Sequence, residues 1–313
     1  MTYHPGIGKD GSHQYVHVSD TEIFNTEGNE AWVRNIREYA ANENAAFIIH
    51  TGDICYENGM KKHIKLMNTE NMNVPVFYCI GNHDLVKGKY GEEVFENNYG
   101  PVYYSFDVAN VHYIVTPMPG GDHKPGYTRL DVCRWLKNDL AHIKPGTPIV
   151  VFNHDILTYG DEFIYKGSET ESIDLNKHNL KAWVYGHWHI NHVKKQGSVY
   201  TVCTSALDKG GIDHSTSAFR IMHVDGKGDF SSELRYSYLN NSICIASPAG
   251  HTASPEVTVN VYSSASPVRR VTYTCLDQDK PVLRDKRLSQ SSDWCWTATL
   301  PLKETHAGKE LTI

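Results

Sequence analysis

Hydrophobic and polar positions follow two different periods along the first three quarters of the chain. Short apolar runs of strand character are separated by stretches in which apolar residues recur every three or four positions, as on one face of a helix. The predicted strands are residues 14–19, 46–50, 75–80, 148–152, 182–185, 199–204 and 218–224, and the predicted helices are residues 30–42, 61–72 and 130–143. Residues 103–108 and 111–116 alternate around a turn at Asn110, which is typical of an antiparallel hairpin. The order strand, helix, strand predicts parallel crossover units and therefore an α/β fold.

The pattern changes near residue 240, where helical periodicity ends. Short β-rich runs then recur between Ser-, Pro-, Asp- and Asn-containing segments, at residues 242–246, 257–262, 268–274, 294–300 and 311–313. This spacing predicts a small β-sandwich over residues 240–313, preceded by a main domain over residues 14–239 and a polar linker over residues 1–13. The last β-rich run reaches the final residue, which leaves open whether the sandwich is truncated.

Five of the predicted apolar strands are followed directly by residues that bind metals or move protons. These residues are Asp20, Asp53, the run Asn82-His83-Asp84, His154, and the pair His187 and His189. Open α/β sheets build their ligand sites at the carboxyl ends of the strands. Oxygen and imidazole groups converging from separate strands indicate a metal site. His17 and His50 lie inside strands instead, so we expect them to be buried and hydrogen-bonded.

Composition excludes several classes of protein. The chain has 313 residues, of which 40% are hydrophobic and 21% charged, as in a soluble globular protein, and its formal net charge of −6 argues against a nucleic-acid-binding surface. No apolar run approaches the length of a membrane span, and the first residues contain no signal peptide. The seven cysteines are scattered and odd in number, so we expect no disulfide framework.

The order and spacing of the polar motifs resemble those of the calcineurin-like metallophosphoesterases. The matching segments are Asp20, Gly52-Asp53, residues 81–84, residues 151–154 and residues 186–189. The resemblance implies a four-layer αββα sandwich with two metal ions at the edge of its sheets. It also implies hydrolysis of phosphate mono- or diesters by attack of a metal-bound hydroxide. The C-terminal β-rich region is similar to the immunoglobulin-like domains that bacterial members carry.

The resemblance further implies a role for each motif residue. One metal ion would be held by Asp20, Asp53 and His189, and the other by Asp53, Asn82, His154 and His187, with Asp53 bridging the two. His83 would face the phosphate and the leaving group, as an acid or an electrostatic stabiliser. Asp84 would orient His83 through a hydrogen bond.

The first motif departs from the family pattern, in which Asp-x-His supplies a histidine ligand. Here Glu22 stands in the position of that histidine. Residues 52–56 resemble the Gly-Asp-x-x-Tyr motif of purple acid phosphatases, whose tyrosine binds ferric iron. Either Tyr56 or Glu22 therefore completes the first site, and we favour Tyr56. The expected metals are iron together with zinc, manganese or a second iron.

The natural substrate is left open by the sequence, as are the mono- or diester preference and the oligomeric state. We expect a small-molecule or envelope-derived phosphate ester, recognised by the polar loops at residues 117–127 and 155–181. The alternative interpretation is a catalytically weak binding module of the cell envelope that retains the fold. The similarity to exported bacterial members predicts an extracytoplasmic location.

Overall fold

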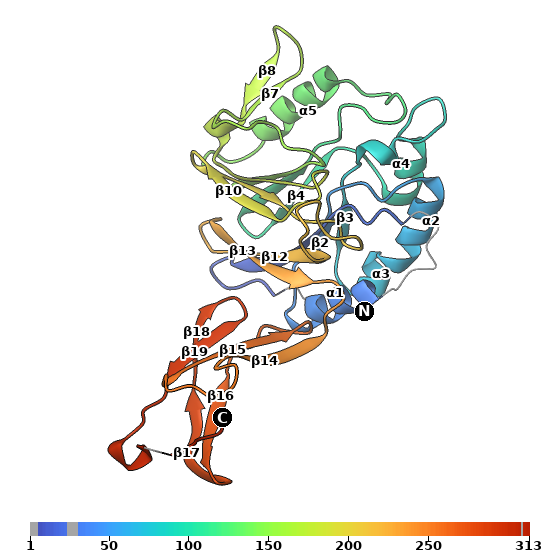
Figure 1. Cartoon of the computed structure of the whole chain (residues 1–313). Helices are drawn as coiled ribbons and strands as arrows, with labels where there is room; N and C mark the ends of the chain where they lie inside the picture. The colour runs from blue at the N-terminus through green and yellow to red at the C-terminus, as the bar shows by residue number, and fades with distance from the viewer. Residues whose placement is uncertain (1–5, 24–30, 308) are drawn as a thin grey trace. The chain divides into compact units, whose positions relative to one another are not determined.

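Two β-sheets face each other in the first part of the chain (Figure 1). The five-stranded sheet has the order β13 (Phe230–Tyr236), β12 (Ala218–Val224), β1 (His13–Val18), β2 (Ile48–His50) and β3 (Val76–Tyr78). The six-stranded sheet has the order β10 (His192–Gln196), β11 (Val199–Cys203), β9 (Leu180–Tyr185), β6 (Ile149–Phe152), β5 (Val111–Val115) and β4 (Tyr104–Val108). The strands β1, β2 and β3 run parallel, as do β5, β6, β9 and β11. The computed structural model describes residues 6–23, 31–307 and 309–313.

The alternation of side chains along each strand produces four layers. In β1, Tyr15 points between the sheets and stacks on Phe47, directly before β2, with ring centroids 4.6 Å apart. Val16 and its neighbours on the opposite face pack against α1 (Ala31–Asn42) and α3 (Thr69–Met72). On the outer face of the six-stranded sheet lies α5 (Arg129–Ala141), together with α2 (Glu57–Leu66) and α4 (Glu93–Tyr99) in the same apolar cluster. The predicted αββα sandwich is confirmed.

Local hydrogen bonds explain where the elements differ from the predicted ones. The expected helix 61–72 is divided into α2 and α3, because the side chain of Asn68 caps α3 by accepting the backbone N–H of Asn71 at 2.9 Å. The expected loop 155–181 contains a hairpin of β7 (Ile164–Lys166) and β8 (Ser172–Asp174). Arg134 of α5 holds this hairpin by bonding Glu171 at 2.6 Å.

Residues Leu239–Ile313 form a second compact unit, separate from the first unit Met1–Tyr238. One sheet has the order β14 (Asn241–Ser247), β15 (Glu256–Ser263), β19 (Cys295–Thr299) and β18 (Ser289–Ser292), and β16 (Thr272–Asp277) pairs with β17 (Lys280–Arg287). Trp296 lies in the apolar core of this unit. The unit is all-β as predicted, whereas its immunoglobulin-like nature stays a prediction. The last β-rich run contributes an isolated bridge at Thr312 rather than a strand.

Two expectations from composition concern the whole chain. All seven cysteines are free thiols, in agreement with the expected lack of a disulfide framework. Among the residues that the structure describes, no helix combines the length and the apolar character needed to cross a membrane.

Candidate metal centre

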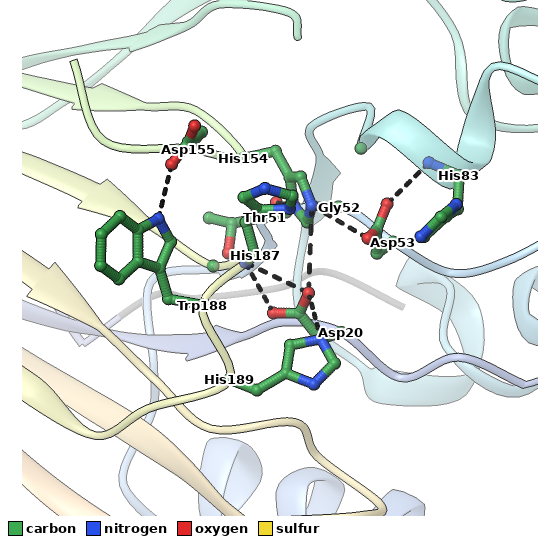
Figure 2. A network of polar contacts seen from close by, with 12 residues as sticks. Asp20, Thr51, Gly52, Asp53, His83, His154, Asp155, His187, Trp188 and His189 are labelled. Carbon is green, nitrogen blue, oxygen red and sulfur yellow. Dashed lines mark hydrogen bonds and ion pairs between the residues drawn. The ribbon is translucent and has the colours of Figure 1, made fainter. Parts of the chain in front are cut away.

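The polar residues that follow β1, β2, β3, β6 and β9 meet at one edge of the two sheets (Figure 2). Asp20, after β1, donates its backbone N–H to Gly52 after β2 at 3.0 Å. Across the sheets, the carboxylate of Asp20 accepts the backbone N–H of His187 at 3.1 and 3.2 Å. Backbone hydrogen bonds therefore fix the loops of the predicted ligands against one another.

Glycines in the motifs allow the loops to approach closely. A Cβ on Gly81 would lie 2.1 Å from Oδ1 of Asp53, and a Cβ on Gly186 would lie 1.8 Å from Oγ of Ser19. Gly81 has extended backbone, with a φ of −92°, so it is required for space rather than for a turn. Any larger residue at either position would push the ligand loops apart.

Several candidate ligands adopt a left-handed backbone conformation. The φ angles are 51° for Asp20, 57° for Asp53, 66° for His187 and 48° for His189. Such conformations cost on the order of 1 kcal/mol for each residue that is not glycine and concentrate at functional sites. The geometry of this edge is thus maintained at the expense of backbone energy.

His154 provides the strongest indication of a bound cation. Its Nδ1 lies 2.7 Å from the carbonyl oxygen of Thr51, which accepts hydrogen bonds only, so Nδ1 carries the proton of the neutral ring. The lone pair of the buried Nε2 of that neutral ring then faces Oδ2 of Asp53 at 3.1 Å. Two electron-rich atoms this close need a cation between them.

Without a metal, a proton takes the place of that cation. Burial lowers the pKa of His154, but the carboxylates of Asp53 and Asp20 outweigh burial and raise it to about 10. A histidine whose Nδ1–H is fixed by a carbonyl and whose Nε2 faces a carboxylate is a common arrangement at metal sites.

Further donor atoms converge on the same place. One ligand atom each from Asp53, His154 and His187 lies within 4.8 Å of the others. Oδ1 of Asn82 is buried and has no hydrogen-bond partner among the described residues. These four residues are the set predicted for the second metal, and their oxygen and imidazole donors suit iron, zinc or manganese.

On the side of the predicted first metal, Nε2 of His189 lies 3.3 Å from Oδ1 of Asp20 and 3.7 Å from Oε1 of Glu22. Tyr56 lies beside His83, with the two rings edge to face and 5.7 Å apart. Its side chain is 42% exposed. The structure therefore places Glu22, the alternative ligand, next to Asp20 and His189.

The expectation that Asp84 orients His83 is wrong. Nδ1 of His83 pairs with Oδ2 of Asp122 at 2.7 Å. The buried carboxylate of Asp84 instead accepts four backbone N–H groups, at 2.9 to 3.0 Å, from Asp53, Ile54, Cys55 and Gly81. Asp84 thus holds the loop that carries Asp53, and Asp122 is the carboxylate that contacts His83.

Asp122 was missed because it lies in the polar loop 117–127, far from the motifs. Its backbone N–H donates to the carbonyl of Asn82 at 3.0 Å, and a Cβ on Gly121 would lie 2.1 Å from that same oxygen. In the sequence, the pair Gly121-Asp122 is the one local feature that indicates contact between loop 117–127 and the loop of Asn82. Burial lowers the pKa of His83, but its hydrogen bond to Asp122 and the charges of Asp53 and Asp122 raise it overall.

The strand histidines behave as predicted. Nε2 of His17 lies 2.9 Å from Oγ1 of Thr51, and Nε2 of His50 lies 3.0 Å from Oγ1 of Thr21. Burial lowers the pKa of His17 to about 3, so this ring is neutral at pH 7. Both side chains support the loops behind the site.

Comparison with known proteins identifies the family of the chain. The family model of the calcineurin-like phosphoesterases matches residues 13–191, more than half of the chain. No curated protein sequence matches the chain.

Three solved structures illustrate how distant the similar proteins are. A dimetal phosphatase from Danio rerio is 10% identical, with a TM-score of 0.48, and the match covers 70% of this chain and 98% of that one. A purple acid phosphatase from yellow lupin is 14% identical, with a TM-score of 0.48, over 84% of this chain and 53% of that one. GAP50, the anchor in the inner membrane complex of Plasmodium, is 14% identical, with a TM-score of 0.47, and the match covers 72% of this chain and 85% of that one. On the family match, the chain belongs to the calcineurin-like phosphoesterases, a family of metal-dependent phosphoester hydrolases.

Proposed function

We propose that this protein hydrolyses phosphate mono- or diesters at a dinuclear metal centre. The observation that carries the proposal is the buried Nε2 of His154, which faces the carboxylate of Asp53 at 3.1 Å while a backbone carbonyl holds Nδ1–H. Bound metal ions would neutralise the charge of the ester and lower the pKa of a water molecule. The residues to hold them are Asp20, Asp53, His189 and a further oxygen ligand at one site, and Asp53, Asn82, His154 and His187 at the other.

Contacts on both oxygens fix the carboxylate of Asp53, the residue that we propose bridges the two metals. Its Oδ1 accepts the backbone N–H of His83 at 3.0 Å, while its Oδ2 faces His154 at 3.1 Å. The loop that carries Asp53 is itself fixed by the carboxylate of Asp84. Little movement of Asp53 is therefore needed when metal binds.

Three properties of His83 support the role of proton donor that we propose for it. The carboxylate of Asp122 accepts a hydrogen bond from Nδ1–H, so Nε2 is the nitrogen left to face a substrate. The two side chains are 35% and 42% exposed, which leaves His83 accessible. A raised pKa favours the imidazolium form, which can give the proton on Nε2 to the leaving-group oxygen.

The proposal is tested with purified protein loaded with Mn²⁺ or with iron and zinc. We expect hydrolysis of p-nitrophenyl phosphate or bis-p-nitrophenyl phosphate, and its loss after chelation with EDTA. Asp53→Asn should lose metal and activity together, because an amide cannot bridge two cations with anionic oxygens. Asp229→Asn is the matched control, since Asp229 is an exposed carboxylate that pairs with Lys181.

Two results would contradict the proposal. Asp53→Asn protein with wild-type metal content and activity would remove the bridging role. Metal-loaded wild-type protein that hydrolyses neither ester would favour the alternative of a binding module.

A further inference from the structure

A second ion pair lies on the His189 side of the centre, and sequence motifs did not indicate it. Nζ of Lys209 contacts Oε2 of Glu22, while the other oxygen of Glu22, Oε1, lies 3.7 Å from Nε2 of His189. The Glu22 side chain is only 12% exposed, so the carboxylate is held inward. Lys209 is 49% exposed and reaches Glu22 from the outside.

On this side the distance between His189 and Asp20 is that of two ligand atoms around one ion, and the distance between His189 and Glu22 is slightly longer. Donor atoms that share a metal at about 2.1 Å stand roughly 3.0 to 3.5 Å apart in octahedral or tetrahedral geometry. Nε2 of His189 is 3.3 Å from Asp20 and 3.7 Å from Glu22. Independent support for a ligand at this edge comes from the buried Nε2 of His154, which lies 3.9 Å from the same oxygen of Asp20.

Backbone contacts fix the position of Lys209. Leu207 donates its N–H to the carbonyl of Ser19 at 3.3 Å, directly before Asp20. Residues 206–210, which include Lys209, form a turn that is closed by the N–H of Gly210 donating to the carbonyl oxygen of Ala206 at 3.1 Å. The ammonium group is therefore carried by a segment that is attached to the ligand loop itself.

We propose that Glu22 is the ligand that completes the first metal site and that Lys209 orients it. This inference rests on the proposed function, because it concerns one of the two metals of that centre. Glu22 replaces a neutral histidine by an anion, and the Lys209 charge offsets the added negative charge. Ligating carboxylates are commonly hydrogen-bonded on their second oxygen, and Lys209 makes this bond here.

Lys209 has two opposing effects on metal affinity, and their sizes decide the expected sign. Its positive charge repels a cation, but a half-exposed ammonium is screened by water and salt. Its bond to Oε2 prevents a flexible glutamate from turning to solvent, and the loss of such a supporting bond typically weakens metal binding 10–100-fold. We therefore expect removal of Lys209 to weaken the first site.

The experiment measures Mn²⁺ binding by titration calorimetry and metal content on metal-free preparations of the full chain. Wild type should bind two ions. Glu22→Gln should weaken one site at least about tenfold and leave the other unchanged. Lys209→Met should weaken the same site about tenfold, and Lys209→Arg should restore it, because an arginine keeps the charged bond. Metal-free melting curves check that each variant is folded.

Tyr56→Phe is the control for the rival ligand. It should leave both Mn²⁺ affinities unchanged, and iron-loaded, oxidised wild type should lack the visible charge-transfer band of a ferric phenolate. The inference is overturned if Glu22→Gln binds both ions as wild type does, if Tyr56→Phe strips the first site, or if Lys209→Met is neutral or tightens binding. Wild-type protein that binds no metal would instead overturn the proposed function itself, and this inference with it.

Discussion

Replacement of Asp84 by asparagine tests whether Asp84 supports the loop of Asp53 or assists His83 in catalysis. The carboxylate of Asp84 is fully buried and accepts four backbone N–H groups. Asparagine has the same shape but keeps one acceptor oxygen, and its NH₂ group would face two N–H donors. We expect the loop of Asp53 to lose two charge-assisted hydrogen bonds and to gain a repulsive contact.

The magnitude follows from those bonds. Each hydrogen bond to a buried charged group contributes about 1.5–3 kcal/mol, so the loss of two should cost about 3–6 kcal/mol. That is a large part of the 5–15 kcal/mol by which a domain is ordinarily stable. Burial and the charge of Asp53 raise the pKa of Asp84 from 3.8 to about 6 despite the backbone bonds, so at pH 8 the ionised carboxylate costs about 3 kcal/mol of stability. Asparagine removes that cost, and the net loss of stability should therefore be up to about 3 kcal/mol.

Urea denaturation of metal-free protein at pH 8 measures the effect as a lower midpoint at unchanged slope. Asp122→Asn is the matched control, because it makes the same chemical change on a side chain that is 42% exposed, and it should cost less than about 1 kcal/mol. The reasoning is refuted if Asp84→Asn is more stable than the wild type. It is also refuted if that variant keeps its stability and slows turnover as a His83 variant does.

The remaining predictions concern the proton donor, acid stability and the second unit. Asp122→Asn should retain both metals yet slow hydrolysis of esters with poor leaving groups more than those with good ones; equal slowing would argue against a role in proton donation. Burial lowers the pKa of His63 to about 3. Its unfolded form binds a proton near pH 6.5, so stability should fall as the pH drops, by about 3 kcal/mol from pH 6.5 to 4. In urea titrations at several pH values, His63→Phe should take up one proton fewer on unfolding, so its unfolding free energy should fall less steeply as the pH drops. Equal pH dependence of the two proteins would contradict the prediction. A fragment ending at Tyr238 should keep both metals, because every candidate ligand lies in the first unit; a folded fragment that lost one ion would place a ligand beyond it.

The sequence by itself predicted the strands and helices of the main domain and most of the candidate site, and its resemblance to a family implied the four layers. Both depend on local features, since side-chain alternation along a strand decides which face is buried, and the first polar residues after a parallel strand must lie at its carboxyl edge. Asp20, Asp53, Asn82, His154 and the His187–His189 pair could therefore be assigned to one edge before their contacts were known. The family match covers residues 13–191, which include all of these residues.

Only the tertiary structure decided the partners of these residues. Asp84 follows His83 directly, but neighbouring side chains of the 3-10 turn at Asn82–Asp84 point in different directions, so adjacency gave the wrong partner. The carboxylate that contacts His83 is 39 residues away, and the ammonium that contacts Glu22 is 187 residues away. A side-chain pair over such distances depends on how loops from different strands dock, and that docking depends on backbone bonds and on the space left by glycines. No periodicity or spacing in the chain records those contacts.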